Sequence, residues 1–423
     1  MKKLLLIASA WLFIPVSVMF NGCLKDTGTS TYKIYTPIYE TTEQMKAGIK
    51  SDVPQPIVNA GKMWIQGNTI FLVELEKGIH IIDNTNPSSP VNKSFINIPG
   101  NEDVSVKGNI LYADCYSNLV AIDISNPANV SAKGFVGDIF PDRSYINGFY
   151  IQSGKVVLRW DIKDTTINLQ LREGNGIWSN GSYISQVVYF FGPTALASSQ
   201  NTTSVGGSMS RMAIVNDRLY IASQQSLSTV SIVNPSAPDF LTHKNLHLGI
   251  GTAETIYPFA DKLFIGSASG MYIFSLSDPD NPSLLSTFSH ASACDPVITD
   301  GTFAYITLHS GTTCHGVVDE LDVVNVQDVT HPSFIKKYSL TSPYGLSKDG
   351  NMLFVCDKGS GLKLFDASDA NNIILKQTIN IPGAYDVICI NKVAVVSAGD
   401  GLYQFDYSDL SNIKQLSKIS LNQ

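Results

Sequence analysis

One short motif recurs along this chain and constrains its fold more than any other feature. In its fullest form, at residues 119–127, an apolar run ends in Asp123 and a Ser-Asn-Pro turn follows. Asp83 and Asp123 are 40 residues apart, as are Asp366 and Asp406. The motif has seven copies, some with a shorter turn or no proline, at residues 78–87, 119–127, 230–235, 271–279, 321–328, 362–369 and 402–409. Such a period is typical of propellers and solenoids, and the Asp and Pro are expected to shape the turn rather than form a site.

Within one period the chain has the pattern of four short strands separated by turns. Gly108 and Asn109 suit the first turn of the second copy, because both residue types accept positive φ. The strands of that copy are expected at residues 103–106, 110–113, 119–124 and 131–136. Four strands per repeat are the unit of a propeller blade, and the 3.6-residue periodicity of an α-solenoid is missing. The sequence therefore predicts an all-β fold, a seven-bladed β-propeller over residues 60–421, closed by packing blade seven against blade one.

About seventy residues between the second and third copies lack the repeat signature. Residues 138–208 are predicted to be an inserted subdomain within the propeller, since both the Asn-Pro turn and the preceding Gly-Asn turn are missing. Residues 160–162 echo the motif, so an eighth, degenerate blade is the alternative. The insertion is rich in aromatic residues, which suit sugars and peptides as binding platforms but would also supply the insertion with its own small core.

The N-terminus has the pattern of an export signal. A positive segment at residues 1–3 precedes an apolar run over residues 4–19 that is too short for a stable transmembrane span. Residues 20–23 are Phe-Asn-Gly-Cys, and a small residue before Cys resembles the lipobox of bacterial lipoproteins, in which the Cys is lipidated. We therefore expect a lipoprotein signal peptide over residues 1–22 and a lipid anchor on Cys23. An ordinary secretory signal cleaved nearby is the alternative.

The segment that follows the expected anchor bears on where the protein goes. The Lys-Asp pair directly after Leu24 favours an outer-membrane lipoprotein exposed at the cell surface, with a periplasm-facing leaflet as the alternative. Residues 23–59 are expected to form a tether and N-terminal segment. Within it we expect a flexible tether over residues 24–31, a strand over residues 32–40 and a short helix that begins after Thr41.

Charge and motif content exclude several function classes. The net charge is −7 and no basic patch is present, so the sequence predicts no nucleic-acid partner. It also contains no Gly-x-Ser-x-Gly elbow, no His-Glu-x-x-His motif and no phosphate-binding glycine loop. A hydrolase or kinase of those families is therefore not expected.

Five cysteines follow the expected lipidation site. Cys294 and Cys314 fall in loops that would emerge on the same face of blade five, so we predict a disulfide between them. Cys115, Cys356 and Cys389 cannot be assigned a pairing. No CxxC pair is present, so a structural zinc site is not expected.

The motif resembles the LVIVD-repeat family of bacterial β-propellers. Residues 121–127 and 81–87 carry the clearest likeness, and Pro-x-x-Pro spacing strengthens it in the copies that contain Pro87, Pro235 and Pro279. The resemblance implies an exported propeller, often lipid-anchored. It implies no catalytic residues, because the family brings none that are established.

The register of the repeats places one set of side chains at the mouth of the central channel. In a propeller the first strand of each blade lines the channel, and the residues where it begins open on one face. The candidate ligand-binding residues there are Lys62, Asp103, Arg211, Glu254, Asp295, Tyr344, Tyr385 and Asp386. Asp103, Asp295 and Asp386 could ligate Ca²⁺ through their oxygens. Ion pairs and turn caps in a water-filled channel are the favoured alternative, so no metal or other cofactor is predicted.

These patterns predict a lipid-anchored propeller of the cell envelope that binds without catalysis. A surface glycan, a peptide or another envelope protein would contact the channel-mouth face. The alternative is an envelope hydrolase or lyase that uses the acidic channel mouth, and the fold alone does not choose between the two. A third possibility is a scaffold whose outer blade edges make the contacts.

Overall fold

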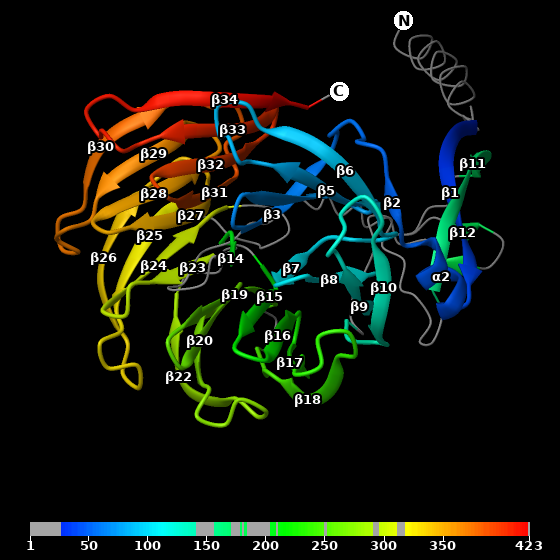
Figure 1. Cartoon of the computed structure of the whole chain (residues 1–423), viewed down its shortest axis with the longest axis horizontal. Helices are drawn as coiled ribbons and strands as arrows, with labels where there is room; N and C mark the ends of the chain where they lie inside the picture. Colours follow the sequence, from blue (N-terminus) through cyan, green and yellow to red (C-terminus); the bar gives the residue numbers. More distant parts are fainter. Residues whose placement is uncertain are drawn as a thin grey trace, which may run out of the picture. The chain divides into compact units, whose positions relative to one another are not determined.

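A computed structural model describes residues 27–140, 156–170, 178–179, 182–183, 204–208, 210–248, 252–290, 296–310 and 318–421. The chain divides into two compact units. The smaller unit comprises Met1–Pro37 and Trp160–Val188, and the larger comprises Ile38–Arg159 and Tyr189–Gln423. The larger unit is a seven-bladed β-propeller, as the repeats predict (Figure 1).

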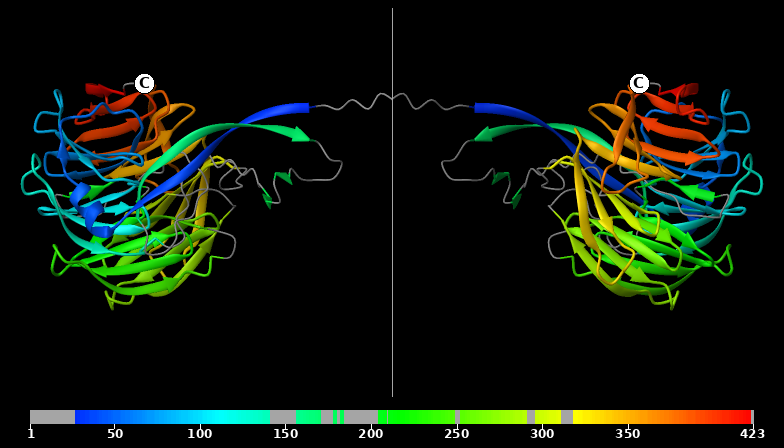
Figure 2. Two further views of the ribbon diagram at one scale, coloured as in Figure 1. Left: turned by 90° about the vertical axis from the view of Figure 1, so that its right-hand side faces the viewer. Right: turned by 90° about the vertical axis from the view of Figure 1, so that its left-hand side faces the viewer.

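Each blade is an antiparallel sheet whose four strands follow one another in sequence, and Figure 2 shows the blades from two further sides. Blade one contains β3 (Ala60–Gln66), β4 (Thr69–Glu74), β5 (Gly78–Asp83) and β6 (Val91–Asn97). Blade two contains β7 (Val104–Lys107), β8 (Ile110–Cys115), β9 (Asn118–Asp123) and β10 (Ser131–Val136). Blade three contains β15 (Met212–Val215), β16 (Arg218–Ser223), β17 (Ser226–Ser231) and β18 (Asp239–Asn245). Blade four contains β19 (Ala253–Phe259), β20 (Lys262–Ser267), β21 (Gly270–Ser275) and β22 (Ser283–Ser289).

The remaining three blades repeat the same order. Blade five contains β23 (Val297–Thr299), β24 (Phe303–Leu308), β25 (Glu320–Asn325) and β26 (Ser333–Ser339). Blade six contains β27 (Pro343–Asp349), β28 (Met352–Asp357), β29 (Gly361–Asp366) and β30 (Ile374–Ile379). Blade seven contains β31 (Asp386–Ile390), β32 (Val393–Ala398), β33 (Gly401–Asp406) and β34 (Lys414–Ser420). The described residues form no eighth four-stranded blade.

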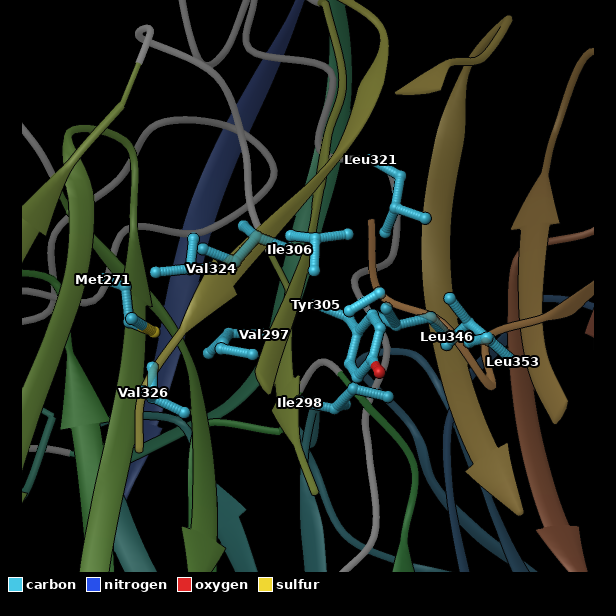
Figure 3. Close-up of a cluster of buried hydrophobic side chains, with 14 of the residues drawn as sticks. Met271, Val297, Ile298, Tyr305, Ile306, Leu321, Val324, Val326, Leu346 and Leu353 are labelled. Atoms are coloured by element: carbon cyan, nitrogen blue, oxygen red, sulfur yellow. The ribbon is translucent and has the colours of Figure 1, made fainter. Parts of the chain in front are cut away.

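The core lies between neighbouring blades. Figure 3 shows one buried cluster to which blade four contributes Met271, blade five contributes Val297 and Tyr305, and blade six contributes Leu346 and Leu353. Both faces of the middle strands are covered in this arrangement, which explains why they are apolar throughout rather than alternating. Burying each such side chain stabilises the fold by about 1.5–3 kcal/mol.

The recurrent motif forms the turn between the third and fourth strands of a blade. The Oδ1 atom of Asp123 accepts the backbone N–H of Ser125 at 2.9 Å, and Asn126 Oδ1 accepts that of Ala128 at 3.1 Å. The carbonyl of Pro127 then accepts the Ser51 hydroxyl at 2.8 Å. The two side-chain contacts are local turn contacts of the kind that Asx residues favour, whereas the Ser51 contact joins the turn to β2 (Ser51–Asp52) before the propeller. The motif therefore shapes the blade, as expected from its sequence.

Blade seven packs directly against blade one and closes the ring. Asn84 and Gln404 exchange two side-chain hydrogen bonds of 2.9 and 2.7 Å across this junction. The Ser417 hydroxyl donates to the carbonyl of Pro87 at 2.7 Å. Both blades take their four core strands from their own repeats, so the predicted closure without a borrowed strand is confirmed.

The segment before the propeller is more ordered than its composition predicts. The helix α2 (Thr42–Gly48) begins after Thr41 with a complete capping box, as expected, and β2 (Ser51–Asp52) adds to the outer edge of β6. No helix in the described ranges is long and apolar enough to cross a membrane.

The prediction of a flexible tether over residues 24–31 is wrong from Thr27 onward. There β1 (Thr27–Glu40) begins, and it pairs with β11 (Val156–Gln170), which lies beside it in Figure 2. The pairing partner is more than a hundred residues away in sequence, which local composition does not reveal. A second small hairpin joins β12 (Trp178–Ser179) to β13 (Ser182–Tyr183).

Candidate functional site

A buried ion pair lies at the centre of the predicted channel-mouth set. Lys62 on β3 and Asp103, which directly precedes β7, approach to 2.5 Å between Nζ and Oδ2. Their side chains are only 5% and 4% exposed. The same Oδ2 accepts the backbone N–H of Arg211 at 2.8 Å, and Oδ1 accepts the Ser210 hydroxyl at 3.0 Å. Asp103 therefore joins the first strands of blades one and two to the chain entering blade three.

The end of the insertion runs among these first strands. The strand β14 (Ser204–Gly206) pairs with the inner side of β3 (Figure 1). The Ser208 hydroxyl then accepts the backbone N–H of Leu346 in blade six at 2.8 Å, and the carbonyl of Ser210 accepts that of Ile256 in blade four at 2.7 Å. We call residues 204–208 and 210 the axial strap. It contacts blades one, two, four and six, so the axial strap lies among the first strands of the blades.

The predicted channel-mouth set also contains aromatic side chains that contact one another. The ring of Tyr344 stacks on His309 with centroids 4.2 Å apart, and Tyr385 lies 5.8 Å from it on the side of blade seven. Lys358 places its ammonium 5.2 Å from the centre of the Tyr344 ring. The hydroxyl of Tyr385 is buried and has no hydrogen-bond partner among the described residues.

Asp386 begins β31 and is completely buried. Burial raises the pKa of its carboxyl well above the ordinary value, against the opposing effects of the Val387 N–H and the charge of Lys62. A side chain at Gly345 would place its Cβ 2.8 Å from the Asp386 carboxylate, so only glycine allows blades six and seven to approach here. Burial likewise lowers the pKa of Lys62, although Asp103 opposes that shift. The site thus disfavours net charge in its interior.

Arg211 and Glu102 form the accessible part of the cluster. Their side chains are 31% and 29% exposed, and 3.9 Å separates Nη1 of Arg211 from Oε2 of Glu102. The Nε atom of Arg211 is buried and has no partner in the described part of the chain. We define the channel-mouth cluster as Lys62, Glu102, Asp103, Arg211, Tyr344, Tyr385 and Asp386.

The repeat register therefore brings together six of the eight predicted binding residues. They are Lys62, Asp103, Arg211, Tyr344, Tyr385 and Asp386. Glu254 lies on β19, where its carboxylate accepts the Thr252 hydroxyl at 3.3 Å. Asp295, the predicted disulfide between Cys294 and Cys314, and the predicted lipidation site Cys23 lie outside the described residues.

The described ranges contain no group of three or more His, Cys, Asp or Glu side chains that could hold a metal ion. Cys115 and Cys356 are buried in β8 and β28, and Cys389 is partly buried in β31.

The sequence did not place His309, Ser208 and Ser210 at the channel mouth. His309 directly follows β24, next to a loop rich in Ser, Thr and Gly. A histidine in such a loop is expected to be exposed to solvent. The two serines precede the third repeat by only a few residues, so extending the repeat alignment upstream of Arg211 was the available signal.

Comparison with known proteins agrees with this architecture. Residues 59–97, 101–138 and 206–243 match the family model described as LVIVD repeat. The fold is similar to that of a protein from Lactobacillus plantarum, with 11% identity, coverage of 85% of this chain and 96% of that chain, and a TM-score of 0.52. It is also similar to the computationally designed Ika8 protein, with 8% identity, coverage of 86% and 90%, and a TM-score of 0.50. At such identities the likeness concerns the fold alone. No curated protein matches the chain.

Proposed function

Because the chain is a seven-bladed β-propeller with LVIVD repeats, consistent with an LVIVD-repeat propeller family, we propose that it is a non-enzymatic binding module of the cell envelope. Its ligand or partner contacts the channel-mouth cluster. One observation carries the proposal: Arg211 Nε and Tyr385 Oη are both buried in this cluster, and neither has a hydrogen-bond partner among the described residues. Buried polar groups in proteins are nearly always paired, so two together indicate where an external group would bind.

The carboxylates of the cluster are engaged by their own chain, which favours binding over catalysis. A general acid or base must reach the substrate within hydrogen-bond distance. Asp103 uses both oxygens in contacts with its own chain, and Oδ1 of Asp386 accepts the backbone N–H of Val387 at 2.6 Å. The accessible groups, Arg211 and Glu102, can recognise a polar ligand without a proton transfer.

The proposal includes a lipid anchor on Cys23 at the outer-membrane surface. The positive N-terminus, the short apolar run and the Gly-Cys pair support it. Replacement of the cysteine, Cys23→Ala, should move the full chain from the membrane fraction to the soluble fraction of the envelope. Unchanged partition into membranes would contradict the anchor.

Binding is tested with the full chain on an array of surface glycans and peptides. The wild-type protein should bind at least one class, and Arg211→Gln and Tyr385→Phe should each weaken that binding. Lys336→Gln on the outer strand β26 is the control and should bind normally. If both cluster variants fold and bind as the wild type does, the channel mouth is not the site. Turnover of any bound glycan or peptide would contradict the non-enzymatic assignment.

A further inference from the structure

We propose that the channel-mouth cluster binds an acidic sugar, whose carboxylate pairs with Arg211 while its ring lies against Tyr344. This inference rests on the proposed function, since it names the ligand class of the same site.

Arg211 is the cation of the cluster that has an N–H donor, on Nε, without an acceptor among the described residues. The charge of Lys62 is taken by Asp103 at 2.5 Å. Glu102, at 3.9 Å from Arg211, is too distant for a hydrogen bond. The planar fork of a guanidinium matches a carboxylate through two parallel hydrogen bonds. A ligand carboxylate on the Nε edge of Arg211 would give the buried Nε–H the acceptor that it lacks.

Tyr385 supplies a second unpartnered group within the same cluster. Its ring lies 5.8 Å from that of Tyr344, and its hydroxyl is buried without a hydrogen-bond partner among the described residues. Both unpartnered polar atoms therefore belong to the channel-mouth cluster. A single ligand with several oxygens, such as a sugar acid, can pair with both.

A second cation lies over the ring of Tyr344. Lys358 stands 5.2 Å from the Tyr344 centroid and makes no ion pair with a carboxylate in the described ranges. Asp319 is the carboxylate that helps raise the pKa of Tyr344. It accepts hydrogen bonds from the backbone N–H and the hydroxyl of Ser310, at 3.0 and 2.7 Å. Arg211 and Lys358 thus bring two cations to this part of the cluster, and local positive charge attracts an anionic ligand.

The aromatic rings favour a sugar over a peptide. His309 stacks on one face of Tyr344, and Tyr385 adds a second, tilted ring beside it. Such a ring offers an apolar face with a polar edge, which matches the rigid CH face and the rim hydroxyls of a pyranose. An acidic peptide also carries carboxylates, but it has no rigid apolar face of this kind.

The test is calorimetric titration of the full chain in detergent with trigalacturonate. Wild type should bind, and Arg211→Lys, which keeps the charge but loses the fork, should weaken binding by at least about tenfold. Tyr385→Phe should weaken it about fivefold, the effect of one hydrogen bond. Lys358→Gln should weaken it about threefold. Lys336→Gln is the matched control, because Lys336 also lies 5.2 Å from a tyrosine centroid, that of Tyr338, but on the outer strand β26. It should leave affinity unchanged.

Two further probes identify the ligand class. Trigalactose tests the need for the carboxylate, and triglutamate tests the need for the sugar ring. If trigalactose binds as tightly and Arg211→Lys weakens it, the acidic class is wrong while the site and the proposed function stand. Tighter binding of triglutamate would overturn the sugar in favour of a peptide. If none of the three binds, the acidic-sugar inference falls, and the array above decides separately whether the channel mouth binds anything. Matching thermal midpoints of wild type and variants exclude misfolding as the cause of a lost signal.

Discussion

The buried pair of Lys62 and Asp103 offers the sharpest test of how the first strands are held together. Asp103→Asn keeps the size of the side chain but leaves the Lys62 ammonium without a counter-charge in a position that is 5% exposed. Removing one partner of a buried pair costs about 3–5 kcal/mol. The side-chain amide of Asn also places an N–H donor where the carboxylate had an acceptor. Depending on its orientation, this donor would face the Lys62 ammonium and the Arg211 N–H, or the Ser210 hydroxyl. We therefore expect the free energy of unfolding to fall by about 3–5 kcal/mol.

Urea unfolding followed by tryptophan fluorescence measures this change, since Trp64 is buried on β3 two residues from Lys62. The double variant Lys62→Met/Asp103→Asn should regain much of the loss, because no unpaired charge is left. Asp217→Asn is the control. Its partner Lys107 also spans two blades at 2.6 Å, but the two side chains are 37% and 56% exposed, so no measurable change is expected.

Two results would refute this reasoning. The first is a loss of less than about 1 kcal/mol for Asp103→Asn, the range of an exposed pair. The second is a double variant no more stable than Asp103→Asn, which would mean that the hydrogen bonds to the axial strap, rather than the buried charge, determine the effect.

Three further predictions concern stability elsewhere in the propeller. Burial alone raises the pKa of Glu74, but hydrogen bonds from His80 and two backbone N–H groups, with a nearby lysine charge, lower it from 4.5 to about 2. The stability contributed by Glu74 is thus present above about pH 4.5 and is lost as the pH falls toward 2. In Glu74→Gln, the midpoint of urea unfolding should therefore change less between these pH values than it does in the wild type. Burial, assisted by a neighbouring carboxylate, raises the pKa of Asp322 from 3.8 to about 6. Its ionised form therefore destabilises the fold, and Asp322→Asn should raise the thermal midpoint at neutral pH but not at about pH 4; an equal rise at both would contradict this origin. Tyr112 donates to the carbonyl of Pro235 across the interface between blades two and three at 3.1 Å, so Tyr112→Phe should cost about 1 kcal/mol in urea unfolding, and no loss would mean that water replaces the bond.

Much of the fold was predictable because each blade carries its own local signals. In blade two, the strand expected at residues 110–113 lies within β8, and the strand expected at residues 131–136 coincides with β10. Turn residues and apolar runs specify these strands over a few positions, and seven repetitions of the pattern remove ambiguity. The β1–β11 pair shows the limit, since neither strand has a repeat to align and each depends on a distant partner.

The sequence by itself determined the blade repeat and the register that places six side chains at one end of the first strands, while an eighth blade stayed open. These side chains are Lys62, Asp103, Arg211, Tyr344, Tyr385 and Asp386. These properties follow from short-range turn chemistry repeated at a constant spacing. Only the tertiary structure decided what these side chains do there. It buries Lys62 and Asp103 as a pair, places the axial strap among the first strands and leaves Arg211 Nε and Tyr385 Oη without described partners. The physical reason is that burial and pairing near the axis depend on contacts among several blades and the end of an insertion, which no single repeat encodes.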